Sequence, residues 1–125
     1  MVNARAKGLR GESDFINAFL KLIGRERGPR DRRQNQATIF GGCNNSDVSI
    51  PELSDLHIEV KNTSTFKFPA WVKQMRKDCG PGKVMTLAYK EQGKAEFFWL
   101  MFPMNDLEKF SCQCAEAFGW RLERD

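Results

Sequence analysis

The architecture of this chain is best predicted from one segment, which reads Asp47-Val48-Ser49-Ile50-Pro51-Glu52-Leu53-Ser54-Asp55-Leu56-His57-Ile58-Glu59-Val60-Lys61. Its last six residues alternate, with apolar side chains at 56, 58 and 60 and polar side chains at 57, 59 and 61. Successive side chains of a β-strand point to opposite faces. We therefore expect a strand over residues 56–61 in which one face is apolar and the other carries Glu59 beside Lys61.

A second acid, Asp47, begins this segment directly after a loop rich in glycine and asparagine over residues 41–46. An aspartate after asparagine and serine is commonly only a turn residue. Asp55 competes with Asp47, because residues 55, 57, 59 and 61 alternate on one face. We prefer Asp47, since the glycine loop allows a bulky substrate to approach closely, but alternation alone leaves the choice open.

The length and composition are those of one globular domain. The chain has 125 residues, of which 41% are hydrophobic and 29% charged. No apolar run approaches the roughly 20 residues that cross a membrane, and the N-terminus lacks the apolar core of a signal peptide. We expect a basic N-terminal arm over residues 1–10, a single domain over residues 11–125, a cytoplasmic location and no membrane partner.

Positive charge is concentrated in the first third of the chain. Residues 1–40 carry nine Lys and Arg against four Asp and Glu, whereas residues 95–125 carry three against six. Such asymmetry suits a surface that binds a polyanion such as a nucleic acid, although a solvated basic face has the same composition.

The four cysteines do not predict a zinc site. Only Cys112 and Cys114 are closely spaced, and the chain has a single histidine. Structural zinc sites need four Cys or His ligands at recurrent spacings. We expect reduced thiols that pack as small hydrophobic side chains.

The order of predicted elements indicates an α/β fold, a compact sandwich in which helices flank a mixed central sheet. The run 97–102 is apolar on both faces, so we expect it to be a central strand or a dimer contact. We expect the three tryptophans, Trp71, Trp99 and Trp120, in the core. The predicted elements are a helix over 11–23, a strand over 37–40, strands over 47–50 and 56–61, a helix over 69–79, a hairpin of 84–89 and 95–102, and a helix over 105–118.

Glu12 shares a helical face with the apolar stripe of the first predicted helix. Residues 12, 15, 16, 19 and 23 fall along this face. Its carboxylate is therefore expected to point towards the core side. The alternative is that Glu12 lies in the first helical turn and only complements the helix dipole. The expected buried stripe consists of Phe15, Ile16, Phe19, Leu20, Leu22 and Ile23.

Two carboxylates and a backbone carbonyl are hard ligands suited to Mg²⁺ or Mn²⁺. A metal of this kind polarises a phosphodiester and lowers the pKa of a bound water. Lys61, on the same strand face as Glu59, could orient the nucleophile and offset developing negative charge. For His57, without histidine or cysteine neighbours, we expect a polar contact on the substrate side.

Asp47 followed by Ile58-Glu59-Val60-Lys61 resembles the signature of the PD-(D/E)XK nuclease superfamily. Glu12 in an opening helix is similar to the extra acid of its archaeal-type Holliday junction resolvases and of small phage endonucleases. Gly41-Gly42 and residues 71–74 also look like those phage proteins. The resemblance spans residues 10–102 and departs from the motif at Ser46, where the family has proline.

This resemblance implies a restriction-endonuclease-like fold and a set of functional residues. A metal, Mg²⁺ or Mn²⁺, would be held by Glu12, Asp47, Glu59 and the Val60 carbonyl. Lys61 would act on the base side of the reaction. Gln74 is similar in position to a glutamine that some branches use near the site, so we expect it to be catalytic as well.

Several basic and hydroxyl side chains are candidates for binding DNA phosphates. Arg25 and Arg27 belong to the same basic stretch, and a solvated linker explains that stretch equally well. The residues expected to bind DNA are Arg10, Arg30, Arg32, Arg33, Thr63, Ser64 and Lys67.

We therefore expect a Mg²⁺-dependent DNA endonuclease that resolves four-way or otherwise branched DNA. A resolvase makes two symmetric cuts, so two copies of a one-site domain in a homodimer would fit the junction. Three alternatives stay open from the sequence: a nicking, repair or flap nuclease of the same fold, a non-catalytic nucleic-acid-binding module, and a protein-interaction adaptor.

Overall fold

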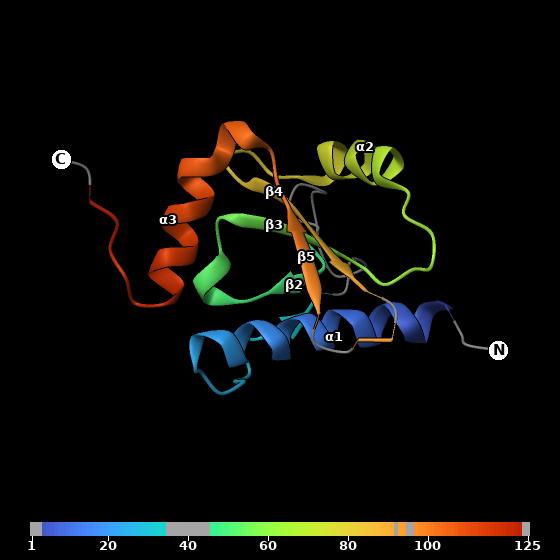
Figure 1. Cartoon of the computed structure of the whole chain (residues 1–125), viewed down its shortest axis with the longest axis horizontal. Coiled ribbons are helices and arrows are strands. Elements are labelled where there is room, and N and C mark those ends of the chain that lie inside the picture. The colour runs from blue at the N-terminus through green and yellow to red at the C-terminus, as the bar shows by residue number, and fades with distance from the viewer. Residues whose placement is uncertain (1–3, 35–45, 92, 95–96, 124–125) are drawn as a thin grey trace.

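The computed structural model describes residues 4–34, 46–91, 93–94 and 97–123, which form three α-helices and two small sheets (Figure 1). The elements are α1 (Ala4–Ile23), β1 (Arg32–Arg33), β2 (Val48–Ser49), η2 (Pro51–Leu53), β3 (Leu56–Lys61), α2 (Phe68–Asp78), β4 (Val84–Lys90), β5 (Phe98–Met101), η3 (Met104–Asp106) and α3 (Leu107–Ala117).

The larger sheet is mixed and has the strand order β3-β4-β5. The strands β3 and β4 are parallel, with Leu56 beside Val84, and β4 and β5 form the predicted antiparallel hairpin, with Leu87 beside Met101. In the smaller sheet, β1 and β2 are antiparallel. A small α/β fold with a mixed sheet flanked by helices is therefore confirmed.

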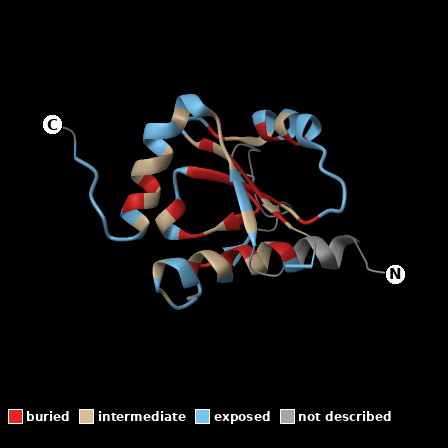
Figure 2. Cartoon of the chain, in the orientation of Figure 1, coloured by how far each residue is buried: buried red, intermediate tan, exposed pale blue. Residues whose placement is uncertain are grey.

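Alternation along β3 and β4 sends their side chains to two different hydrophobic clusters. Leu56, Ile58 and Val60 join Val84 and Ala88 in the cluster that packs against α1 and α3. On the other face, Leu87 packs with Trp71 and Met75 of α2. Figure 1 shows α1 and α2 on opposite sides of the sheet, and Figure 2 shows that β3 and β4 are mostly buried.

The first helix begins earlier than the sequence pattern predicts. It starts at Ala4, so residues 4–10, expected as an arm, are helical. Alanine, arginine, lysine and leucine predominate there, and all are strong helix formers. Gly24 follows the helix with φ of +71°, as expected for a C-terminal cap. Phe15, Ile16 and Leu20 are buried, but Leu22 is exposed, so its assignment to the buried stripe is wrong.

The apolar run near residue 100 does not form a central strand. Within the described part of the chain, β5 is an edge strand and β4 is central. Trp99 and Leu100, which point to opposite faces of β5, are both exposed. Trp120, beyond α3, is also exposed, so of the three tryptophans only Trp71 lies in the core as predicted.

Other sequence-based expectations have mixed outcomes. The helix predicted over 69–79 is α2, and the one predicted over 105–118 is η3 followed by α3. The strand predicted over 37–40 and the glycine loop over 41–45 lie outside the described residues. Cys79, Cys112 and Cys114 are free thiols, as expected. None of the described helices has the length and apolarity needed to span a membrane.

Candidate functional site

Asp47 is fixed against the edge of β3. Its backbone amide donates to the Ile58 carbonyl at 2.7 Å, and its carboxylate oxygen Oδ2 accepts from the Val60 amide at 2.8 Å. Only 9% of Asp47 is exposed. Its competitor Asp55 is exposed and precedes the start of β3, where its amide donates to Gln113. Asp47, rather than Asp55, is therefore the acid held beside the end of β3 that carries Glu59.

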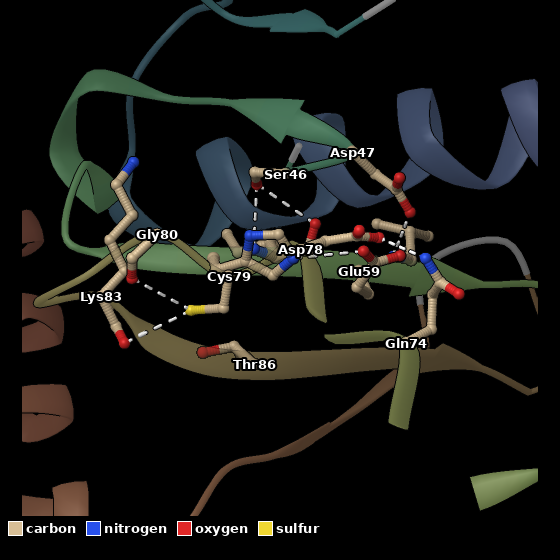
Figure 3. Close-up of polar contacts among 12 residues, drawn as sticks. Ser46, Asp47, Glu59, Gln74, Asp78, Cys79, Gly80, Lys83 and Thr86 are labelled. Carbon is tan, nitrogen blue, oxygen red and sulfur yellow. Dashed lines mark hydrogen bonds and ion pairs between the residues drawn. The ribbon is translucent and has the colours of Figure 1, made fainter. Parts of the chain in front are cut away.

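Ser46, the residue directly before Asp47, anchors this segment to β3. Its hydroxyl oxygen accepts from the Ile58 amide at 2.9 Å and lies within donating distance of the Ile58 and Val48 carbonyls (Figure 3). A proline could not make these side-chain bonds. The serine thus provides its own means of holding Asp47 against β3.

Glu59 lies in the middle of the site and is contacted at both carboxylate oxygens. It is only 4% exposed. Lys61 Nζ lies 3.8 Å from Oε2, and His57 Nε2 lies 3.1 Å from Oε1. His57 itself has 0% exposure, so its expected contact with substrate is wrong. The strand alternation was predicted correctly, but α2 covers this face and buries its polar side chains.

Glu12 reaches the same region from α1. It lies well inside the helix, which begins at Ala4, so the alternative that it complements the dipole in the first turn is wrong. It is partly buried, and burial raises the pKa of Glu12, with Arg33 and Lys61 opposing the rise and Glu59 adding to it. The charges of Glu12, Glu59 and Lys61 are thus close enough to act on one another.

A close approach of two backbones positions Glu12. A Cβ atom added to the neighbouring Gly11 would lie 2.9 Å from the Cβ of Asn62, which directly follows β3. Atoms of this kind do not normally come so close. The absence of a side chain at Gly11 therefore lets α1 lie against the end of β3.

Asp47 is the most strongly perturbed acid of the group. Burial, followed by the charge of Glu59, raises the pKa of Asp47 to about 8, and Glu12 adds to the rise. The Val60 amide and Lys61 act in the opposite direction. At neutral pH these acids therefore resist being charged together.

The donor chemistry of this group suits a hard divalent cation. Carboxylate oxygens are the ligands that Mg²⁺ and Mn²⁺ prefer, and a nearby cation favours the charged form of acids that repel one another. As their side chains stand, however, no three Asp, Glu, His or Cys residues in the described ranges are close enough to ligate one ion. Val60 lies between Glu59 and Lys61, and its amide holds Asp47.

Gln74 is oriented by its own helix. It is exposed on α2, and its amide nitrogen donates to Asp78 Oδ2 at 2.6 Å (Figure 3). A catalytic role for Gln74 stays a prediction.

The basic cluster divides into two groups. Arg25 pairs with Asp31 and Glu52, and Arg27 donates to Ser13 and Asn17, so these two stabilise the fold. The exposed group consists of Arg10, Arg30, Arg32 and Arg33.

The strand β1 brings part of the exposed group to the site. Arg33 pairs with Val48, the residue after Asp47, and its charge acts on Glu12. Arg32 is its neighbour on the same strand. This strand therefore carries positive charge to the edge of the acidic group.

The segment after Lys61 also lies near the site. Thr63, Ser64 and Lys67 are exposed there. Thr63 Oγ1 donates to the Thr65 carbonyl at 2.8 Å, and the Tyr89 hydroxyl donates to the Thr63 carbonyl at 2.9 Å. The loop is thereby tied to the end of β4.

An exposed aromatic ring in this loop is a feature that the sequence analysis missed. Phe66 is 50% exposed, and its ring centroid lies 5.3 Å from that of Trp71 and 5.1 Å from that of Tyr89. Lys61 Nζ lies 5.8 Å from the Trp71 ring centroid. A phenylalanine inside a polar connection was the signal that could have indicated it.

Comparisons of the chain with protein families, with curated proteins and with solved structures gave no match.

Proposed function

We propose that this chain is a divalent-metal-dependent DNA endonuclease whose preferred substrate is branched DNA. The observation that carries the proposal is the pairing of two buried acids, Asp47 and Glu59, at one strand edge beside the Lys61 amine. Burying charged groups costs free energy unless a counter-charge, hydrogen bonds or a bound metal ion offsets that cost. Acids with a strongly raised pKa, such as Asp47, are concentrated at functional sites.

The acids Glu12, Asp47 and Glu59, with the Val60 carbonyl, are the residues that would hold Mg²⁺ or Mn²⁺. When bound, this metal would polarise the phosphodiester and make a water molecule more acidic. Asp47 and Glu59 are pre-positioned for this role by the Val60 amide and by the two partners of Glu59.

Lys61 has two tasks in this proposal. Its amine, 3.8 Å from the Glu59 carboxylate, can orient the attacking water and stabilise the negative charge that develops on the phosphate. Its position over the Trp71 ring limits where the amine can move. The exposed Arg32 and Arg33 on β1 would contact the flanking phosphates.

The exposed ring of Phe66 supports a substrate with unpaired bases. Every base can stack on an aromatic ring, but only an unpaired or splayed base is free to do so. Phe66 is held by Trp71, and Trp71 contacts Lys61, so the ring stands next to the proposed reaction centre. Flaps and single strands offer such bases, and a four-way junction offers them when the base pairs at its crossover open.

A homodimer would suit a two-fold substrate. The strand β5 lies at the edge of the sheet and exposes Trp99 on one face and Leu100 on the other, so its edge is where a second copy could pair. Sedimentation of the full chain tests this part of the proposal, which predicts a dimer at micromolar concentration. A monomer at every concentration would contradict it.

A cleavage assay tests the proposed activity. Four-way junction, flap, linear duplex and single-stranded DNA of matched sequence are incubated with the chain, with Mg²⁺, with Mn²⁺ and with EDTA. We expect metal-dependent cleavage that is fastest on the junction. Equal cleavage of linear duplex would contradict the preference for branched DNA. Absence of cleavage of every substrate would contradict the proposed nuclease activity.

A further inference from the structure

His57 is buried in a way that the packing of the fold alone does not require. It is completely inaccessible to solvent. Among the described residues, its Nδ1 is the only buried side-chain nitrogen or oxygen without a hydrogen-bond partner. An unpaired buried polar atom costs free energy. An apolar side chain of similar size would fill the same space without this cost.

The other ring nitrogen makes a single, specific contact. His57 Nε2 lies 3.1 Å from Glu59 Oε1. Because residues 57 and 59 alternate onto the same face of β3, the imidazole and the carboxylate stand side by side under α2. Nε2 shares a hydrogen bond with this carboxylate, whereas Nδ1 has no hydrogen-bond partner among the described residues.

We propose that His57 is a positioning residue, which fixes the Glu59 carboxylate for binding a divalent cation. The inference deepens the proposed function and rests on it. With Oε1 held by His57 and Oε2 close to Lys61, the carboxylate has little freedom to rotate. The charge of Glu59 acts on Asp47, so the two acids lie near each other. Hydrogen bonds that orient a metal ligand in this way commonly control the affinity for the metal.

Full burial also defines what His57 does not do. A side chain with no exposed surface cannot touch DNA or the attacking water, so His57 is not itself catalytic. Its effect must pass through Glu59. A change at residue 57 should therefore alter the affinity for the cation while leaving DNA affinity as it is.

Three substitutions separate positioning from simple packing. In H57Q the side-chain amide nitrogen can reach the place of Nε2, whereas in H57N the amide reaches only the place of Nδ1. In H57L the volume is kept and both nitrogens are lost. The first readout is the Mn²⁺ dissociation constant of the protein alone, and the second is the Mg²⁺ concentration that gives half-maximal cleavage of a four-way junction.

We expect H57N and H57L to weaken Mn²⁺ binding by about 10- to 100-fold, and H57Q to stay close to the wild-type protein. The urea midpoint of H57L should fall, because the buried Glu59 carboxylate loses its partner at Oε1, and this loss outweighs the removal of the unpaired nitrogen. If H57L does not fold, the Mn²⁺ affinities of H57Q and H57N can still be compared, because these two variants are similar in polarity.

Two results would overturn the role of His57: unchanged Mn²⁺ affinity in H57N, or a folded H57Q variant weakened as much as H57N. Failure of the nuclease is recognisably different. A wild-type protein that binds Mn²⁺, loses affinity in H57N and cleaves no DNA would retain the positioning role and exclude the nuclease. A wild-type protein that binds no Mn²⁺ would overturn both.

Discussion

The carboxylate of Asp47 accepts a hydrogen bond from the backbone amide of Val60, at 2.8 Å, across the edge of β3. This bond fixes Asp47, which directly precedes β2, close to Glu59, the residue before Val60 in β3. The amide partly stabilises the charged form of Asp47, but burial and the charge of Glu59 outweigh it. Asp47 is therefore a neutral carboxylic acid over much of the neutral pH range.

Asp47→Asn should change how the stability of the protein depends on pH. The pKa of Asp47 is raised to about 8 in the folded chain, above its unfolded value near 4. Its stabilising contribution is therefore complete below about pH 4 and is lost as the pH rises towards 8, by at most about 1.4 kcal/mol per pH unit. The asparagine variant should lack this loss and be the more stable protein at pH 8.

Urea unfolding at pH 5, 6, 7 and 8 in EDTA measures this difference. Asp55→Asn is the matched control, because Asp55 is exposed, and it should unfold with the same pH dependence as the wild-type chain. A wild-type protein whose stability rises between pH 5 and pH 8 relative to D47N would show that the site does not hold a protonated acid.

Glu59→Gln and Lys61→Met should each abolish most DNA cleavage without preventing DNA binding. Both keep the size of the side chain, but the first removes a proposed ligand and the second removes the amine beside it. We expect the cleavage rate of a junction to fall by about 10²- to 10⁴-fold. Electrophoretic mobility shifts in Ca²⁺ should change little. Lys73→Met on the exposed surface of α2 is the control, and its loss of activity to the same extent would argue for a general charge effect.

Gly11→Ala should displace α1 from the end of β3. Alanine improves the helix by about 1 kcal/mol, but its Cβ would meet the Asn62 Cβ at 2.9 Å, and overpacking typically costs about 1–3 kcal/mol. We expect a net loss of stability in urea and weaker Mg²⁺ activation, because Glu12 moves with the helix. Gly28→Ala, where the nearest atom is an Asp31 oxygen at 3.7 Å, should leave Mg²⁺ activation unchanged. A G11A protein that is more stable than the wild type would contradict the close approach of α1 to Asn62.

Phe66→Leu should reduce the preference for branched DNA while leaving metal-dependent cleavage intact. Leucine keeps an apolar side chain against Trp71 but offers no ring to a base. Stacking on one aromatic ring is worth about 1–3 kcal/mol, so the ratio of junction to duplex cleavage should fall by about 10-fold. Phe118→Leu is the control, since Phe118 is also exposed and stacks only on Trp120 among the described rings. An unchanged ratio of junction to duplex cleavage in F66L would contradict the role of the Phe66 ring in stacking on a base.

The strongly periodic parts of the fold could be predicted from the sequence. Residues 56–61 alternate strictly, and they form β3 with the predicted bounds. Pro69 and Gly80 bracket the apolar stripe of α2, which covers Phe68–Asp78. In both cases the local pattern and the tertiary packing agree, which is the condition under which such patterns are informative.

The neighbours of a helix or strand in the folded chain could not be predicted from local patterns. The run around Trp99 is apolar on both faces, which is typical of a central strand, yet β5 is an edge strand within the described residues. His57 reads as a polar residue on an open face, but α2 covers it. Neighbours of this kind depend on contacts between distant segments, and alternation within one segment does not contain them.

In the candidate site, too, some features follow from local sequence patterns and others depend on tertiary contacts. The approach of Glu12 to Glu59 follows from the helical phase of α1, and the choice of Asp47 over Asp55 was only favoured by the glycine loop. The hydrogen bonds that hold the site together, from Ser46, Val60 and His57, come from side-chain and backbone geometry. No spacing in the sequence indicates them.

The central claim is that Glu12, Asp47 and Glu59 together bind a divalent cation. Titration of Mg²⁺ into the protein at pH 7, by calorimetry in buffers of different ionisation enthalpy, tests it most directly, because binding must release the proton that Asp47 holds. We predict saturable binding with release of about one proton per chain, and loss of that release in D47N. Absence of Mg²⁺ binding, or binding with the same proton release in D47N, would contradict the claim.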